Sequence, residues 1–309
     1  MNQTHIAAAI AVQSGAPKMM LGMNTTGLSS YTGAFQFANL MYTATLERAS
    51  GTGTWVHDQG LITTTDQNDI FRFKLADNEY LLPAGDYTVL NPSGLSIAVG
   101  AWGAPAVGEF TTATTLTFTV SSSPGVVAKS LFVKGNVTNA SGNLAVILPG
   151  HLSSWQAGNI WNTDFLNFFS DLGVRCIRFM DALLVNTSLE TDWADRTVTT
   201  KPTLWNPVAG GKAYPHEFVI DLCNRLHVTP WINMPSRATQ QYKASCAALY
   251  ASSLSTDLKV IVEDCNEVWN YSNPFGFNTS WFVYRSFTKK EATYNSGSNT
   301  WSIASHGFT

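Results

Sequence analysis

The strongest indication of the fold class is the segment Lys259-Val260-Ile261-Val262, followed by Glu263-Asp264-Cys265-Asn266-Glu267-Val268-Trp269-Asn270. It contains the last of four short apolar runs, which lie at 144–148, 176–180, 230–234 and 259–265. Three segments with helical spacing separate them, at 164–172, 215–226 and 241–254. Buried strands that alternate with helices are typical of a parallel sheet or barrel. The second half of the chain therefore predicts four β/α units, with Asn266-Glu267 at the end of the fourth strand.

The first half of the chain has the pattern of an all-β unit. Apolar and polar residues alternate at 71–75, and further short strands are expected at 87–90, 95–99 and 115–120. Turn-forming residues such as Pro83-Ala84-Gly85-Asp86 separate them. This pattern predicts a β-sandwich or jelly roll over residues 1–140, followed by a β/α barrel domain over 141–309.

The predicted barrel is incomplete. Four β/α units are half of a TIM-type barrel, and 165 of the 309 residues follow residue 144, where about 250 are usual. A half-barrel leaves sheet edges and apolar faces uncovered. The expected fold class is multidomain β plus α/β, a sandwich and the first half of a TIM-type barrel. We expect the chain to be the front part of a longer protein.

The composition argues against several classes of protein. Charged residues make up 13% of the chain, against about 25% in a typical protein, although the hydrophobic share of 45% is ordinary. With 18 basic and 21 acidic residues the formal charge is −3. This charge argues against a nucleic-acid partner and a polybasic membrane anchor. No apolar run approaches the roughly 20 residues of a membrane span. The polar, weakly charged surface is typical of exported proteins and viral appendages.

The N-terminus and the cysteines bear on localisation. Residues 1–5 carry no Lys or Arg before the apolar run at 6–12, so a secretory signal has little support. No CxxC pair occurs, and His216 and His227, expected at the surface or core edge, have no second ligand at a fitting spacing. We therefore expect no metal and no cofactor. The thiols are expected to be buried and free, which fits synthesis of the protein in a reducing cytoplasm. The expected location is extracellular or on a virion. The thiols are those of Cys176, Cys223, Cys246 and Cys265.

The candidate chemistry lies at the end of the fourth strand. Alternation places Glu263, Cys265 and Glu267 on one face, which in a closed barrel is the inside. A carboxylate at a strand mouth serves as a general acid when burial raises its pKa. Asn266 is suited to donate a hydrogen bond to a sugar hydroxyl, and Trp269 to stack on a pyranose ring. The alternative is a solvated loop acid beside a helix N-terminus, and the Asn-Glu pair alone does not decide between them.

Several blocks of sequence with a shared spacing resemble one family. The blocks are Arg178-Phe179-Met180-Asp181, Trp193-Ala194-Asp195-Arg196, Pro230-Trp231-Ile232-Asn233-Met234-Pro235 and residues 262–270, with Leu21-Gly22-Met23-Asn24 and Gly27-Leu28-Ser29-Ser30-Tyr31 before them. They are similar to cellulase-like proteins of the retaining (β/α)8-barrel glycoside hydrolase superfamily, in which a β-sandwich accompanies the barrel. The resemblance spans most of residues 21–287.

The resemblance implies roles for individual residues. Glu267 would be the acid/base, Asn266 the partner of the sugar hydroxyl next to the cleaved bond, and Arg178 the residue that orients the nucleophile. We expect these three to converge at the C-terminal ends of the strands. Further sugar contacts are expected from Trp269, Trp193, Asp181, Trp231 and Asn233.

One departure from the family concerns the nucleophile. A retaining mechanism needs a second carboxylate about 5–5.5 Å from the first. The family carries it on strand seven, beyond the four units found here. Neither Asp181 nor Glu263 matches that position, and Glu263 is expected to form a structural ion pair with Arg178.

Two classes of function remain open. One is a β-glycoside hydrolase that acts on polysaccharide and carries an accessory sandwich. The other is a virion structural protein, such as a tail fibre or spike, that binds or degrades host surface glycan with or without catalysis. Polysaccharide or cell-surface glycan is the expected partner in both. A homo-oligomer or other virion components are the protein partners that the second class adds.

Overall fold

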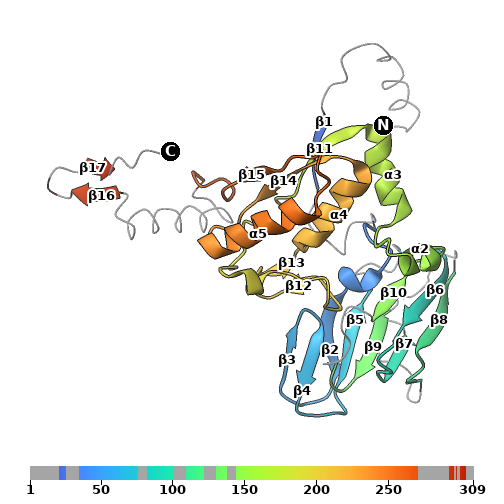
Figure 1. Cartoon of the computed structure of the whole chain (residues 1–309). Helices are drawn as coiled ribbons and strands as arrows, with labels where there is room; N and C mark the ends of the chain where they lie inside the picture. The colour runs from blue at the N-terminus through green and yellow to red at the C-terminus, as the bar shows by residue number, and fades with distance from the viewer. Residues whose placement is uncertain are drawn as a thin grey trace.

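The computed structural model describes residues 21–25, 35–75, 82–100, 109–121, 130–137, 144–270, 292–295, 297 and 300–303. In these residues the chain is a mixture of strands and helices arranged in several sheets. Figure 1 shows antiparallel strands in the lower part and helices packed against a parallel sheet in the upper part. A separate antiparallel hairpin is formed by β16 (Ala292–Asn295) and β17 (Thr300–Ile303).

The antiparallel part comprises the described residues of 35–148. β5 (Ile70–Lys74) alternates strictly, with Phe71 and Phe73 fully buried, as the sequence predicts for a half-buried strand. Both main sheets contribute to one hydrophobic cluster, which includes Phe73, Tyr87 and Val146. The four-stranded sheet has the order β2 (Thr45–Ser50), β5, β9 (Ser130–Lys134), β7 (Ile97–Gly100). The three-stranded sheet has the order β10 (Ala145–Ile147), β6 (Gly85–Leu90), β8 (Thr115–Val120), and β3 (Trp55–Asp58) and β4 (Leu61–Thr64) form a hairpin.

The apolar run at 144–148 belongs to this antiparallel part. Its strand β10 pairs antiparallel with β6, with Val146 opposite Val89, and Val146 N donates to Asn39 Oδ1 at 2.9 Å. The prediction that this run is the first of the parallel strands is therefore wrong. An all-apolar run predicts a strand that is buried on both faces, but burial alone does not determine which strand it pairs with.

The parallel sheet has the order β1 (Leu21–Asn24), β11 (Val174–Arg178), β14 (Thr229–Asn233), β15 (Ile261–Glu263). Every neighbouring pair is parallel. β1 is the first strand of this sheet, the position predicted for residues 144–148. The antiparallel part is thus inserted in the chain between the first and second parallel strands. The other three strands lie where the sequence predicts them, although β15 ends at Glu263.

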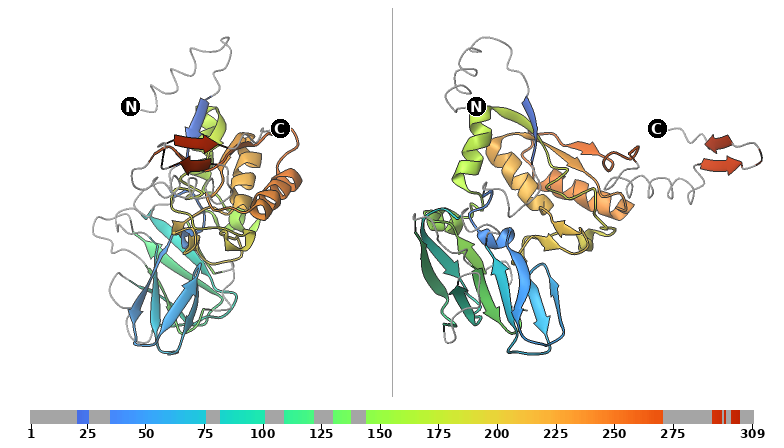
Figure 2. Two further views of the ribbon diagram at one scale, coloured as in Figure 1. Left: turned by 90° about the vertical axis from the view of Figure 1, so that its left-hand side faces the viewer. Right: turned by 180° about the vertical axis from the view of Figure 1, so that it is seen from behind.

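Three helices precede β11, β14 and β15, and each begins and ends within one residue of its predicted bounds. They are α3 (Thr163–Leu172), α4 (His216–Leu226) and α5 (Gln240–Ser253). α3 begins where Asn162 Oδ1 accepts from Asp164 N at 3.0 Å. It ends at Gly173, whose φ of 64° is left-handed and favours glycine. Figure 2 shows α4 and α5 alongside each other against the strands.

The two faces of the parallel sheet differ in chemistry. Ile177 and Ile232 are buried in the hydrophobic cluster to which α4 and α5 contribute. Because side chains alternate along a strand, Arg178 and Trp231, which are paired in register, project from the opposite face. Glu263, paired with Asn233, lies on that face too. The helices therefore cover the apolar face, and the polar residues share the other.

The connection from β11 to α4, residues 179–215, also contacts the antiparallel part. It contains the 3-10 turn η3 (Trp193–Asp195) and the hairpin of β12 (Trp205–Asn206) and β13 (Gly211–Lys212). Leu204 N donates to Tyr42 O at 3.1 Å, and Lys201 pairs with Asp58 at 2.7 Å. This connection therefore links the two parts of the molecule.

All four cysteines are free thiols, as predicted. Cys223, Cys246 and Cys265 are buried, and Cys176 on β11 is half-buried. Cys265 lies two residues past the end of β15 rather than on the strand. Within the ranges described above, no helix is long and apolar enough to cross a membrane, in agreement with the composition.

Candidate functional site

An ion-pair cluster lies at the C-terminal ends of the parallel strands. Arg178 ends β11 and donates through Nη2 and Nε to Glu263 Oε2 at 2.7 and 3.2 Å. Trp231 on the intervening strand β14 donates through Nε1 to the same oxygen at 3.0 Å. The guanidinium carbon of Arg178 lies 5.2 Å from the centre of the Trp231 ring. Glu263 thus forms the ion pair with Arg178 that the sequence analysis expected.

Asn266 joins this cluster from the turn that follows β15. It is 2% exposed, and its Oδ1 accepts from Arg178 Nη2 at 2.9 Å. Its Nδ2 donates to Asn186 Oδ1 at 2.8 Å, and Asn186 belongs to the loop after β11. The structure therefore brings Arg178 and Asn266 into direct contact, and it orients the Asn266 amide from both ends.

The backbone leaves the strand direction after Glu263. Cys265 and Glu267 have φ values of 72° and 44°, in the left-handed region that residues other than glycine rarely adopt. The prediction that Glu263, Cys265 and Glu267 share one strand face is therefore wrong, because the strand has ended. Cys265 is buried instead, and burial raises the pKa of its thiol to about 11. Asn233 Nδ2 donates to Cys265 O at 3.0 Å and ties the turn to β14.

Glu267 and Trp269 follow Asn266 in the same turn. Glu267 Oε2 accepts from Asn270 Nδ2 at 2.8 Å, and Asn270 N donates to Glu267 O at 2.9 Å. Trp269 is 73% exposed, more than any other large hydrophobic side chain in the part of the chain that the structure describes. The turn thus presents a carboxylate and an accessible aromatic ring next to Asn266.

Asp181 and Trp193, two other predicted site residues, occupy different surroundings. Asp181 lies just after β11, where partial burial raises the pKa of its carboxyl and the positive charge of Arg178 opposes that shift. Trp193 packs against a second cluster, with its ring centre 5.7 Å from that of His216 and 5.1 Å from that of Tyr242. Asp181 therefore accompanies Arg178, whereas Trp193 is part of the second cluster.

That second cluster surrounds Glu190, which the sequence analysis did not single out. Glu190 is 5% exposed, and it accepts hydrogen bonds from the Tyr242 hydroxyl at 2.8 Å and from Asn206 Nδ2 at 3.4 Å. Burial raises the pKa of its carboxyl to about 7. His216 is not at the surface but buried between the hydroxyls of Tyr242 and Tyr250, and burial lowers its pKa to about 3. No local pattern marks Glu190, because its partners come from β12 and α5, distant in the chain.

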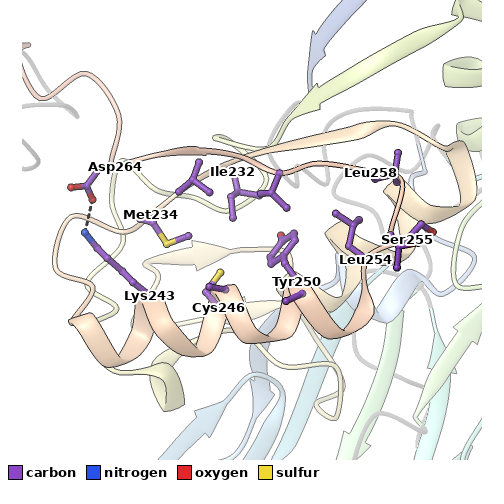
Figure 3. Close-up of a pocket in the computed structure, with 14 residues that line it drawn as sticks. Ile232, Met234, Lys243, Cys246, Tyr250, Leu254, Ser255, Leu258 and Asp264 are labelled. Carbon is purple, nitrogen blue, oxygen red and sulfur yellow. Dashed lines mark hydrogen bonds and ion pairs between the residues drawn. The ribbon is translucent and has the colours of Figure 1, made fainter. Parts of the chain in front are cut away.

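A hollow of about 670 Å³ lies on the helix-covered face of the sheet, between α5 and the last two strands (Figure 3). At one end Lys243 Nζ pairs with Asp264 Oδ1 at 2.8 Å. Its walls are mostly apolar and include Ile232, Met234, Cys246, Tyr250 and Leu254. Neither Arg178 nor Glu263 lines it, so it is separate from the candidate site.

Among the described residues, no group of three or more His, Cys, Asp and Glu side chains is placed to hold a metal ion. Comparison with known proteins finds no matching family model and no matching curated protein. The resemblance to cellulase-like proteins therefore stays a hypothesis carried by the quoted residues, and the function has to be argued from the geometry above.

Proposed function

We propose that the protein acts on polysaccharide by the chemistry of retaining β-glycoside hydrolases, with its site at the C-terminal ends of β11, β14 and β15. The observation that carries the proposal is the contact of Arg178 with Asn266, immediately before Glu267. An arginine from one strand and an Asn-Glu pair after another are the elements that the resemblance implies. Glu267 would then donate the proton to the leaving group, and Asn266 would bind the adjacent sugar hydroxyl. The nucleophilic carboxylate that forms the glycosyl-enzyme bond would come from the position that the family carries on strand seven, which is not among the four parallel strands described.

The arrangement of the strands supports the proposal. Four parallel strands in sequence order, with helices on one face, fit the first four units of a (β/α)8 barrel, whose interior would carry Arg178, Trp231 and Glu263. Active sites of such barrels lie at the C-terminal ends of the strands. The two antiparallel sheets with their shared core fit an accessory β-sandwich.

The backbone on both sides of Asn266 adds a second argument. Left-handed φ values at Cys265 and Glu267 cost roughly 1–3 kcal/mol each, and such outliers cluster at active sites and ligand clamps. The hydrogen bonds of Asn266 to Arg178 and Asn186 fix its amide before any ligand arrives. A preorganised amide beside a carboxylate suits recognition of a sugar hydroxyl.

A second candidate function is glycan attachment without hydrolysis, as in a virion appendage. It is favoured by Glu263, whose carboxylate is engaged by Arg178 and Trp231 and so is not placed as a nucleophile. The exposed ring of Trp269 offers a stacking surface that needs no catalysis. In this case the partners would be cell-surface glycan and other virion components, and the location would be extracellular or virion.

The two candidates separate in an assay of hydrolysis and binding on carboxymethylcellulose, xylan and mixed-linkage β-glucan. For the hydrolase, Glu267→Gln lowers the rate about 10²- to 10⁴-fold while binding is kept. Glu109→Gln, an exposed position in the antiparallel part, is the matched control and leaves both unchanged. Equal rates for Glu267→Gln and the wild type exclude Glu267 as the acid. Binding without hydrolysis that is lost in Trp269→Ala supports attachment, and absence of both binding and hydrolysis overturns both candidates.

A further inference from the structure

The candidate site depends on the loop that follows β11. Asn186 in this loop accepts the hydrogen bond of Asn266 Nδ2 at 2.8 Å. The same loop carries Asp181 next to Arg178 and continues to η3. Any change in the position of the loop therefore moves the oxygen that orients Asn266.

Glu190 fixes this loop from the inside. It lies four residues after Asn186 and is 5% exposed. Tyr242 of α5 and Asn206 of β12 donate to its two oxygens at 2.8 and 3.4 Å. Glu190 N also donates to Ser188 Oγ at 3.2 Å, which tightens the backbone around the carboxyl. The loop is thus attached through one side chain to two elements far apart in the sequence.

A cavity of about 10 Å³ lies between Glu190 and Asn233 of β14. Glu190, Tyr242 and Asn233 are among the residues that line it. Asn233 is fully buried and donates to Cys265 O at 3.0 Å, one residue before Asn266. Glu190 is therefore linked to Asn266 along the loop through Asn186, and it also lies beside Asn233, which holds the residue before Asn266.

We infer that Glu190 is a positioning residue for the candidate site, holding the 179–196 loop so that Asn186 and Asn233 keep Asn266 against Arg178. That the site binds glycan rests on the proposed function, but the positioning does not.

The charge state of Glu190 makes the inference testable by pH. Burial, the largest effect, and the nearby Asp195 raise its pKa, whereas the Tyr242 hydrogen bond and Arg196 lower it, with a result of about 7 against an ordinary 4.5. The neutral carboxylic acid therefore favours the loop conformation of the structure, called closed, in which Glu190 is buried. Ionisation favours an open conformation of the loop, in which water reaches the carboxylate. Between pH 4.5 and about 7 the opening equilibrium should rise by up to about tenfold per pH unit and then level off.

Other ionisable groups face Glu190 from the packed elements. η3 and its end contribute Asp195 and Arg196, and α4 contributes His216 and Glu217, which pairs with Arg196 at 3.0 Å. Burial keeps His216 neutral at pH 7. If opening of the loop exposed His216, its protonation would favour the open loop as the pH falls, which is opposite to the effect of Glu190. A Glu190 variant separates the two contributions.

Amide hydrogen exchange of the full chain between pH 5 and 8, corrected for the intrinsic rate, provides the test. In the wild type, protection of residues 179–190 and 264–267 should fall as the pH rises to about 7. Glu190→Gln is neutral at every pH and should remove this dependence, whereas Glu109→Gln keeps it. Tyr242→Phe retains the ring and loses the donor, and should raise exchange of the loop about 10- to 100-fold at all pH values.

An unchanged pH dependence in Glu190→Gln, or unchanged exchange of residues 264–267 in Tyr242→Phe, overturns the inference. Binding of carboxymethylcellulose over the same pH range adds a functional readout. The affinity should fall as the pH rises in the wild type, but not in Glu190→Gln. If no polysaccharide binds, the proposed function fails, while the exchange result still decides the positioning role.

Discussion

The substitution Glu190→Gln should also change the pH dependence of global stability. The pKa of Glu190 is about 7 in the folded protein because its carboxyl is buried, and 4.5 in an unfolded chain. The folded state therefore binds this proton more tightly, so the stabilisation is fully present below pH 4.5 and is lost as the pH rises to about 7. At about 1.4 kcal/mol per pKa unit, the loss amounts to roughly 3 kcal/mol. Glutamine does not titrate, so the variant lacks this loss.

The assay is urea unfolding followed by tryptophan fluorescence at half-unit steps from pH 4 to 8.5. The free energy of unfolding of the wild type minus that of Glu190→Gln should fall by roughly 3 kcal/mol across this range. His216, whose pKa is lowered to about 3 by burial, destabilises the protein as the pH falls below 6.5. It is present in both proteins and cancels in the difference. A difference that is flat with pH, or that grows as the pH rises, would show that the carboxyl of Glu190 does not have a raised pKa in the folded protein.

Three further predictions concern other parts of the structure. Glu263→Gln removes the carboxylate that forms the ion pair with half-buried Arg178, and should lower the free energy of unfolding by about 1–3 kcal/mol in urea titrations. An unchanged free energy of unfolding would mean that the ion pair is not structural. Phe73→Ala opens a cavity in the core of the antiparallel part, and calorimetry should show a lower Tm with a loss of about 3–5 kcal/mol, while a smaller loss would indicate that the core collapses around the site. In thiol titration of the native protein, half-buried Cys176 should react before buried Cys246, whose pKa is raised to about 12 by burial. The reverse order would contradict the burial of Cys246.

Local periodicity predicts the helices and most strands because it records which face is buried. The helix over Thr163–Leu172 combines an amphipathic pattern with a capping Asn162 and a terminal Gly173. The alternation around Phe71 and Phe73 likewise identifies β5. These signals depend on residues within one or two turns of each other, so they are readable without tertiary contacts.

Strand partners and the end of β15 have no such local signal. The run at 144–148 is apolar throughout, and its place is set by β6 and by Asn39, 107 residues before Val146 in the chain. Leu21–Asn24 is too short for a periodic pattern, and it is a strand because β11 pairs with it. Nothing in the residue types of Cys265 and Glu267 announces a left-handed backbone, since tertiary contacts impose it.

The Glu190 cluster cannot be predicted from the sequence for a related reason. A single glutamate in a polar loop looks solvated, and only the arrival of Tyr242 and Asn206 from distant elements buries it. By contrast, the contact between Arg178 and Asn266 was foreseeable because parallel strands end at one edge of a sheet.

The insertion of the antiparallel part between β1 and β11 has a consequence for the order of folding. β11 meets β14 across about 50 residues, whereas Thr25, next to β1, contacts Arg178 across 153. Closing the longer loop costs about 1 kcal/mol more in chain entropy if the intervening residues are unstructured. Prior folding of the antiparallel part would shorten the effective loop, because its own contacts bring the ends of the insertion together. β1 is thus the strand of highest contact order in the sheet, and it should dock last, after the inserted part has formed.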